Sequence, residues 1–143
     1  MEPQATLKKK IRVLLVEDHA ISRQVVLEIL RVAGCEAQAA ENGERALALF
    51  DTQAYDLVLM DIGLPDMDGL TVTRRIRQME HQKPGIPIIA LSANVGDEPK
   101  QDARLIDAGL TDWITKPLTP SILAAMLQSL AFQEPTMKAA TEH

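Results

Sequence analysis

The sequence predicts an α/β fold, a doubly wound five-stranded parallel sheet with helices on both faces. Five short apolar segments alternate with segments whose apolar residues recur every three to four positions, the pattern of strands alternating with helices. The connections are short, and strand–helix–strand units of this kind place neighbouring strands parallel with right-handed crossovers. With 143 residues, the chain suits one domain with a sizeable core.

The first half of the chain supplies three strands and two helices. Residues 1–10 are polar and form the expected solvated leader. A strand over residues 11–16 precedes a helix that Gly34 closes, and a weaker strand spans 36–40. Asn42 and Gly43 open the second helix, and the third strand ends at Asp61. The apolar residues of the two helical patterns are Val25, Val26, Ile29, Leu30 and Ala33, then Ala46, Leu47, Leu49 and Phe50.

The second half continues the alternation. A helix follows Gly69 and loses its pattern over residues 80–85, and a fourth strand spans 86–91. A weaker helix ends at Gly109, a short strand covers 112–115, and Thr119-Pro120 begins the last helix of a domain that spans residues 11–131. Residues 132–143 form a tail. The residues that define these three helical patterns are Leu70, Val72, Thr73 and Ile76; Ala103, Leu105 and Ile106; and Ile122, Leu123, Met126, Leu127 and Leu130.

Composition narrows the classes of function. A net charge of −5 argues against a general nucleic-acid binder or a membrane-surface protein, whose partners are anionic. The single cysteine, Cys35, cannot form an internal disulfide, and we interpret it as a half-buried apolar residue. No apolar segment approaches the length of about 20 residues that a membrane span needs. A reducing cytosolic compartment is therefore expected, and His19, His81 and His143 show no metal-ligand spacing.

Carboxylates end the first and third strands. In a flavodoxin-like strand order 2-1-3-4-5 these strands are neighbours, and ligands bind beyond their carboxyl ends. Glu17, Asp18 and Asp61 would then repel one another by roughly 3 kcal/mol per pair at about 5 Å and an effective dielectric near 20. A divalent cation relieves this repulsion, and Mg²⁺ suits hard oxygen ligands. The alternative is a solvated acidic rim without a metal ion.

Later strand ends supply groups suited to a phosphoryl ligand. Ser92 offers a hydroxyl and Lys116 an ammonium, which phosphoryl transfer uses to neutralise charge on the equatorial oxygens. Taken alone, Ser92 is equally a turn residue and Lys116 a solvated surface lysine. Asp61 has no evident structural role, since Asp68 is the better cap for the helix that follows.

With these residues in view, the chain resembles a receiver domain of a two-component signalling system over about residues 11–131. The motifs that carry the resemblance are Val16-Glu17-Asp18, Met60-Asp61-Ile62-Gly63-Leu64-Pro65-Asp66-Met67-Asp68-Gly69, Ala90-Leu91-Ser92-Ala93 and Lys116-Pro117. They occur in the family's order with suitable spacing. Together they are highly specific, although each alone is weak.

The resemblance implies roles for these residues. Asp61 would accept a phosphoryl group from a phosphohistidine on a histidine kinase or a histidine phosphotransfer domain. Asp18, Asp61 and the Gly63 carbonyl would hold Mg²⁺, with Glu17 acting largely through water. Ser92 and Lys116 would contact the phosphoryl oxygens, and the Lys116–Pro117 peptide bond would be cis.

Two positions depart from the family pattern. Trp113 stands where the family usually has tyrosine or phenylalanine, the aromatic residue that turns inward on phosphorylation, and Ser92 replaces the commoner threonine. We expect Ser92 and Trp113 to form the switch, with the bulk of Trp113 limiting its rotation. Gly63 and Asn94 occupy the positions that tune dephosphorylation in the family. We therefore expect the lifetime of the phosphorylated state to be specific to this chain.

Several alternatives are weaker. An aspartyl-nucleophile phosphatase typically has a second Asp two residues after the first, where this chain has Gly63; Glu17-Asp18 would repel a flavin phosphate; and no Gly-rich nucleotide loop is present in the sequence. The context most resembles the C-terminal receiver of a hybrid sensor histidine kinase, with a stand-alone response regulator as the alternative. We expect a phosphoacceptor that is not itself an enzyme, is cytoplasmic, is a monomer or weak dimer, and contacts neither nucleic acid nor membrane.

Overall fold

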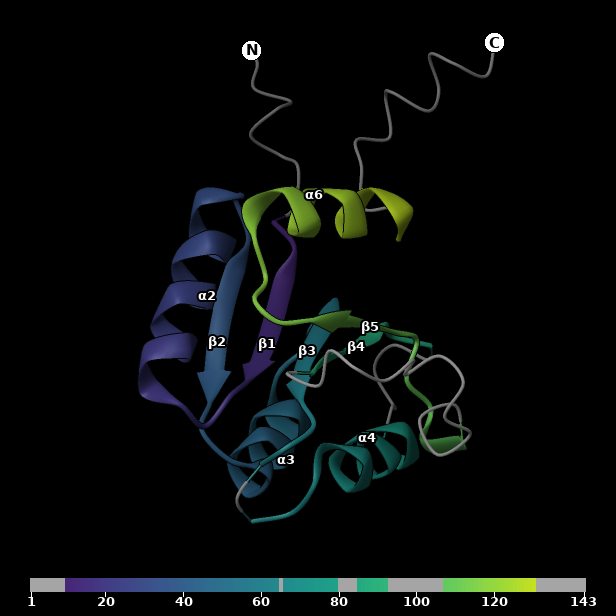
Figure 1. Ribbon diagram of the computed structural model, residues 1–143. Coiled ribbons are helices and arrows are strands. Elements are labelled where there is room, and N and C mark those ends of the chain that lie inside the picture. The colour runs from purple at the N-terminus through teal and green to yellow at the C-terminus, as the bar shows by residue number, and fades with distance from the viewer. Residues whose placement is uncertain (1–9, 65, 80–84, 93–106, 131–143) are drawn as a thin grey trace, which may run out of the picture.

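Five parallel strands form one sheet in the order β2-β1-β3-β4-β5, which confirms the predicted topology (Figure 1). The computed structural model describes residues 10–64, 66–79, 85–92 and 107–130. The elements in chain order are β1 (Arg12–Val16), α2 (Ala20–Val32), β2 (Glu36–Ala40), α3 (Gly43–Thr52), β3 (Leu57–Asp61), α4 (Gly69–Gln78), β4 (Ile88–Ser92), β5 (Asp112–Thr115) and α6 (Pro120–Ser129).

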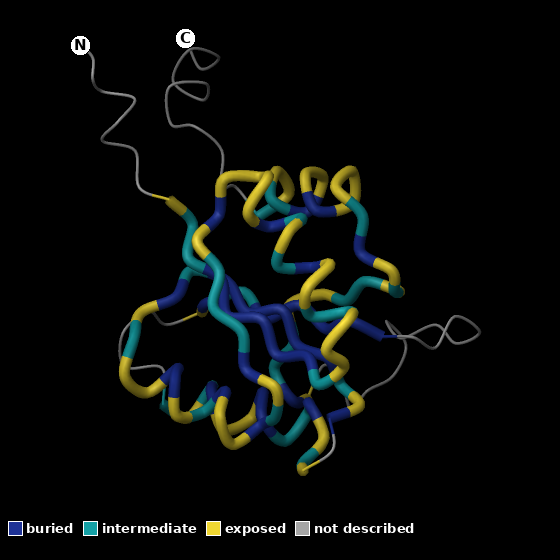
Figure 2. The backbone as a smooth tube through the Cα atoms, turned by 90° about the vertical axis from the view of Figure 1, so that its left-hand side faces the viewer, coloured by how far each residue is buried: buried dark blue, intermediate teal, exposed yellow. Residues whose placement is uncertain are grey.

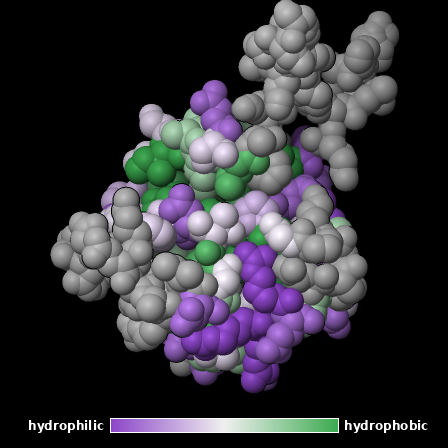
Figure 3. Space-filling view, turned by 90° about the vertical axis from the view of Figure 1, so that its right-hand side faces the viewer, coloured by the Kyte–Doolittle hydropathy of each residue, from purple (hydrophilic) through white to green (hydrophobic). Residues whose placement is uncertain are grey.

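Helices cover both faces of the sheet because successive strand residues point to opposite sides. Val13 and Leu15 of β1 pack with α2 and α6, whereas Leu14 and Val16 pack with α3 and α4. The central strands β1, β3 and β4 lie buried between the two helical layers, whereas the edge strands β2 and β5 are only partly buried (Figure 2). The outer surface of α4 is hydrophilic (Figure 3). Among the described helices, none is long and apolar enough to cross a membrane.

Most predicted helix ends are confirmed. The side chains of Asn42, Asp68 and Thr119 accept hydrogen bonds from backbone N–H groups in the first turns of α3, α4 and α6. Gly34 follows α2 with a φ of 89°, a left-handed conformation that glycine adopts without a steric penalty. Cys35 is more buried than expected, and burial raises the pKa of its thiol.

Three described residues of the predicted apolar patterns are exposed instead, one of them Ala33, which follows α2. Val25 on α2 is 51% exposed and Ile122 on α6 is 38% exposed. On α2 the core contacts come from Val26 and Leu30, and Val25 lies about 100° further round the helix from Val26. The apolar surface of α2 is therefore wider than the part that the sheet covers.

Some boundaries differ from the sequence-based expectation, and others fall outside the described residues. β4 begins at Ile88 rather than residue 86 and includes Ser92, while Pro87 precedes the strand and its carbonyl accepts the Val58 N–H at 3.0 Å. The leader over residues 1–9, Asn94, the helical pattern over 103–106 and the tail over 132–143 lie outside the described residues.

The strand register brings four chain segments together at one edge of the sheet. Val16 pairs with Met60, so Glu17 and Asp61 follow neighbouring positions of β1 and β3. Asp61 pairs with Leu91, and Ser92 pairs with Thr115, which precedes Lys116. The carboxyl ends of β1, β3, β4 and β5 therefore meet where a ligand binds in sheets of this class.

Candidate functional site

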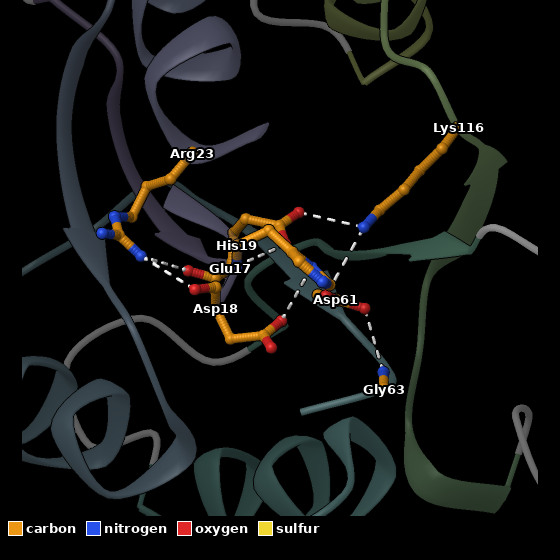
Figure 4. A network of polar contacts seen from close by, with 7 residues as sticks. All are labelled: Glu17, Asp18, His19, Arg23, Asp61, Gly63 and Lys116. Atoms are coloured by element: carbon orange, nitrogen blue, oxygen red, sulfur yellow. Dashed lines mark hydrogen bonds and ion pairs between the residues drawn. The ribbon is translucent and has the colours of Figure 1, made fainter. Parts of the chain in front are cut away.

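Three carboxylates converge at this edge (Figure 4). Glu17, directly after β1, is fully buried, Asp61 at the end of β3 is 6% exposed, and Asp18 is half-buried. Each of these residues, together with His19, offers one ligand atom within 4.8 Å of the others. The structure thus brings together the acidic residues that the sequence places at two strand ends.

Lys116 lies across from these carboxylates. Its Nζ atom donates to Glu17 Oε1 at 3.0 Å and to Asp61 Oδ2 at 3.4 Å. Burial alone would lower the pKa of the ammonium, but the hydrogen bond to Glu17 and the charge of Asp61 outweigh it and raise the pKa. The Lys116 backbone N–H donates to the Ser92 carbonyl at 2.7 Å, and the Lys116–Pro117 peptide bond is cis, as the resemblance implies.

Two residues at the site were not predicted from the sequence: His19, judged to have no metal-ligand spacing, lies in the acidic cluster, and Arg23 was not considered. His19 donates its backbone N–H to Glu17 Oε2 at 3.2 Å, and its Nδ1 lies 3.5 Å from Asp18 Oδ1. Arg23 donates to the carbonyls of Glu17 and Asp18 at 3.1 and 3.2 Å, which fastens the turn between β1 and α2. The position of His19 directly after Glu17-Asp18 could have predicted its place at the site. Nothing in the sequence around Arg23 predicts its contacts with the backbone.

The loop after Asp61 brings backbone groups to the site. The Gly63 N–H donates to Asp61 Oδ1 at 2.9 Å. Further along, α4 begins against the loop so closely that a Cβ at Gly69 would lie 2.6 Å from Ile62 Cα and 2.7 Å from the Asp61 carbonyl oxygen. Only glycine allows this approach, so Gly69 keeps the start of α4 close to the end of β3.

Ser92 and Trp113 lie on the same face of neighbouring strands. Trp113 pairs with Ala90, which is two residues before Ser92, so the side chains of Ser92 and Trp113 share one side of the sheet. Ser92 is 5% exposed at the end of β4, and Trp113 is half-buried on β5. The two predicted switch residues therefore share one face of neighbouring strands, and Ser92 directly follows Leu91, the residue that pairs with Asp61.

The donor set fits a small divalent cation. Asp18 Oδ1 is buried and has no hydrogen-bond partner among the described residues. A buried carboxylate oxygen of this kind needs a donor or a cation to offset the loss of hydration. Three carboxylates face one ammonium, and hard oxygen donors suit Mg²⁺. The residues present therefore match the chemistry of a magnesium site.

Replacing Lys116 with Met tests this charge balance. In metal-free protein the substitution leaves Glu17 buried without its cation, so we expect the free energy of unfolding at pH 7 to fall by about 1–3 kcal/mol. Because the folded pKa of Lys116 is raised, this stabilisation is complete below the unfolded lysine pKa of about 10.4 and is lost as the pH rises through the folded value.

Urea unfolding of the wild-type chain and Lys116→Met between pH 7 and pH 12 measures the effect, with the exposed Lys10→Met as the control. The difference between the wild type and Lys116→Met should shrink above the unfolded lysine pKa. Equal losses in the two variants, or a difference that does not change with pH, would contradict the ion pair.

Comparisons with known proteins identify the family of this chain. The model of the response regulator receiver domain family matches residues 13–128. The sensor histidine kinase GacS of Pseudomonas protegens is 36% identical over 88% of this chain, and the aerobic respiration control sensor protein ArcB of Escherichia coli is 37% identical over 82%. The chain spans only 14% and 15% of those two relatives.

Solved structures show the same fold. The receiver domain of the sensor histidine kinase PA1611 from Pseudomonas aeruginosa, with a magnesium ion coordinated in its active-site cleft, superposes with a TM-score of 0.74 at 34% identity, covering 85% of this chain and 97% of that one. The chemotaxis response regulator CheY4 of Vibrio cholerae gives 0.77 at 30% identity, covering 85% and 99%. The chain belongs to the response regulator receiver domain family.

Proposed function

We propose that this chain is the phosphoacceptor of a histidine–aspartate phosphorelay and that Asp61 receives the phosphoryl group. The observation that carries the proposal is the setting of the Asp61 carboxylate. Lys116 Nζ lies 3.4 Å from one oxygen, the Gly63 N–H lies 2.9 Å from the other, and further carboxylates adjoin it. In the transfer, an Asp61 oxygen bonds to phosphorus, the phosphorus–nitrogen bond of phosphohistidine breaks, and the freed imidazole nitrogen takes a proton.

The remaining site residues would bind the cation and the transferred group. Asp18, Asp61 and the Gly63 carbonyl would hold Mg²⁺, and Glu17 would act through water. When bound, Mg²⁺ neutralises negative charge on the phosphoryl oxygens and the carboxylates. Lys116 would exchange a carboxylate oxygen for a phosphoryl oxygen, and the Ser92 hydroxyl would donate to another. The structure of TrrA from Thermotoga maritima in complex with Mg²⁺–BeF, 32% identical to this chain, supports the proposal.

The proposed conformational switch involves Ser92 and Trp113, which share one face of neighbouring strands. As Ser92 turns toward the phosphoryl group, the space beside it changes and Trp113 repacks on the same face of the sheet. This movement would alter the surface around β5. Trp113 is the only tryptophan of the chain, so its emission reports the change directly.

Phosphorylation by a small acyl phosphate tests the proposal. With Mg²⁺ present we expect the intact mass to increase by one phosphoryl group and the Trp113 emission to change, because the site holds both the nucleophile and the charge-neutralising groups. Asp61→Asn should lose both effects. Asp68→Asn should keep them, because Asp68 caps α4 from the same loop without touching the acidic cluster. A mass increase that survives Asp61→Asn would refute the assignment.

The parent context is a further proposal. The relatives include the hybrid signal transduction histidine kinase L of Dictyostelium discoideum and also transcription factor SKN7 of Saccharomyces cerevisiae, which is 37% identical over 85% of this chain. We favour a receiver of a hybrid sensor histidine kinase that exchanges phosphoryl groups with a kinase or a histidine phosphotransfer domain. In this setting the domain is a cytoplasmic monomer or weak dimer and a phosphoacceptor without turnover of its own.

An apolar surface beside the acidic cluster supports a protein donor. Ile21 is 81% exposed and Val25 is 51% exposed, one turn apart on α2. They line a cavity of about 230 Å³ together with Leu118, Glu17 and Lys116. A phosphohistidine must come close to Asp61, so the element that carries it must cover this adjoining surface. We propose that Ile21 and Val25 pack against the donor's helix.

Ile21→Asp tests this contact. A charge at an apolar interface position weakens docking, so transfer from a phosphorylated histidine phosphotransfer domain that labels the wild-type chain should slow about tenfold. Labelling by a small acyl phosphate should not change, since it needs no docking surface. Val32→Asp is the matched control, because Val32 is 70% exposed at the other end of α2. Equal slowing by the two variants would contradict the proposed surface.

A further inference from the structure

The loop over residues 62–68 needs an attachment beyond its own two ends. Its base is closed, because the Gly69 N–H donates to the Ile62 carbonyl at 3.1 Å and Gly69 packs against Ile62 Cα. Gly63 lies within the loop, is exposed and has no side chain that packing could hold. The hydrogen bond from the Gly63 N–H to Asp61 fixes the N–H side of the peptide group between Ile62 and Gly63. Leu64, the next residue, is 8% exposed and packs in the core, and the loop beyond it depends on a second attachment.

Asp66 supplies that attachment. Its Oδ1 accepts the Gly43 N–H at 2.9 Å and its Oδ2 accepts the Glu44 N–H at 3.0 Å. Both N–H groups belong to the first turn of α3, where backbone donors lack intrahelical partners. These backbone hydrogen bonds lower the pKa of Asp66, and the one from Gly43 has the largest effect. The carboxylate is therefore charged at neutral pH. The helix already has its own cap in Asn42, whose side chain accepts the Arg45 N–H at 2.8 Å.

The same turn is joined to the other side of the acidic cluster. The Glu17 N–H donates to the Ala40 carbonyl at 3.0 Å, at the end of β2 and just before α3. Met67 also packs tightly on the turn, since a Cβ at Gly43 would lie 2.6 Å from Met67 Cγ. Residues 40–44 therefore contact both the segment that carries Glu17 and the loop that carries Gly63.

We propose that Asp66 is a positioning residue for the cation site: it fastens the Gly63 loop to the turn that also holds Glu17, and so sets where the Gly63 backbone lies relative to the acidic cluster. The inference rests on the proposed function in taking that cluster as a cation site. A backbone carbonyl serves as a ligand only when it is held within about 0.5 Å of its place. Asp66 is three residues from Gly63, so its release leaves the buried Leu64 as the remaining attachment of the loop beside Gly63.

Asp66→Ala and Asn42→Ala separate positioning from helix capping. Asp66→Ala removes two hydrogen bonds from the first turn of α3 and Asn42→Ala removes one, but only Asp66→Ala releases the loop. In metal-free protein, amide hydrogen exchange at Gly63 should accelerate in Asp66→Ala and not in Asn42→Ala. Mg²⁺ affinity, measured by calorimetry on the full chain, should fall about tenfold in Asp66→Ala, as for residues that orient metal ligands, and stay within about twofold in Asn42→Ala.

Asp66→Asn should lie between the wild type and Asp66→Ala, because its amide oxygen still accepts one N–H. Urea unfolding midpoints identify any variant that has lost its fold. If Asp66→Ala is unfolded, Asp66→Asn is compared with Asn42→Ala in its place. Equal losses of Mg²⁺ affinity in Asp66→Ala and Asn42→Ala, or unchanged Gly63 exchange in Asp66→Ala, would overturn the positioning role alone. A folded wild-type chain that binds no Mg²⁺ would overturn the proposed function and, with it, the role given to Asp66.

Discussion

The charge balance at the carboxyl edge of the sheet is the constraint on which the site depends. A fully buried Glu17 is costly unless a cation compensates it, and Lys116 provides that cation at 3.0 Å. The two residues are 99 positions apart in sequence, so the contact exists only when β1 and β5 end at the same edge. The fold and the site are therefore mutually dependent, because the sheet brings the charges together and the ion pair makes their burial tolerable.

One ammonium leaves this balance incomplete. Lys116 contacts Glu17 and Asp61, while Asp18 Oδ1 remains buried without a hydrogen bond among the described residues. A bound divalent cation would complete the balance and release Lys116 for a phosphoryl oxygen. In this view the metal-free site keeps its shape through an ion pair that phosphorylation later replaces. The strands hold the acidic groups rigidly, and the loop after Asp61, which Asp66 fastens to the first turn of α3, would add the Gly63 carbonyl as a ligand.

Much of this arrangement could be predicted because strand order alone determines which strand ends are neighbours. Apolar segments ending in Glu17 and Asp61, combined with the flavodoxin-like strand order, placed both carboxylates at one edge. The contacts of Arg23 and Asp66 were not predictable, since they join these side chains to backbone groups whose positions only the folded chain defines. The exposure of Val25 was also missed, because α2 has more apolar residues than the sheet covers and periodicity does not show which of them remain in solvent.

The central claim is that the phosphoryl group resides on Asp61, and chemical trapping locates it directly. Borohydride reduces an aspartyl phosphate to homoserine, and trypsin then releases residues 46–74 as one peptide, which carries Asp61 together with Asp51, Asp56, Asp66 and Asp68. After treatment with Mg²⁺ and a small acyl phosphate, fragment-ion masses should show homoserine at position 61 and unchanged aspartate at the other four positions. Homoserine at another position, or none in a chain whose intact mass shows phosphorylation, would contradict the claim.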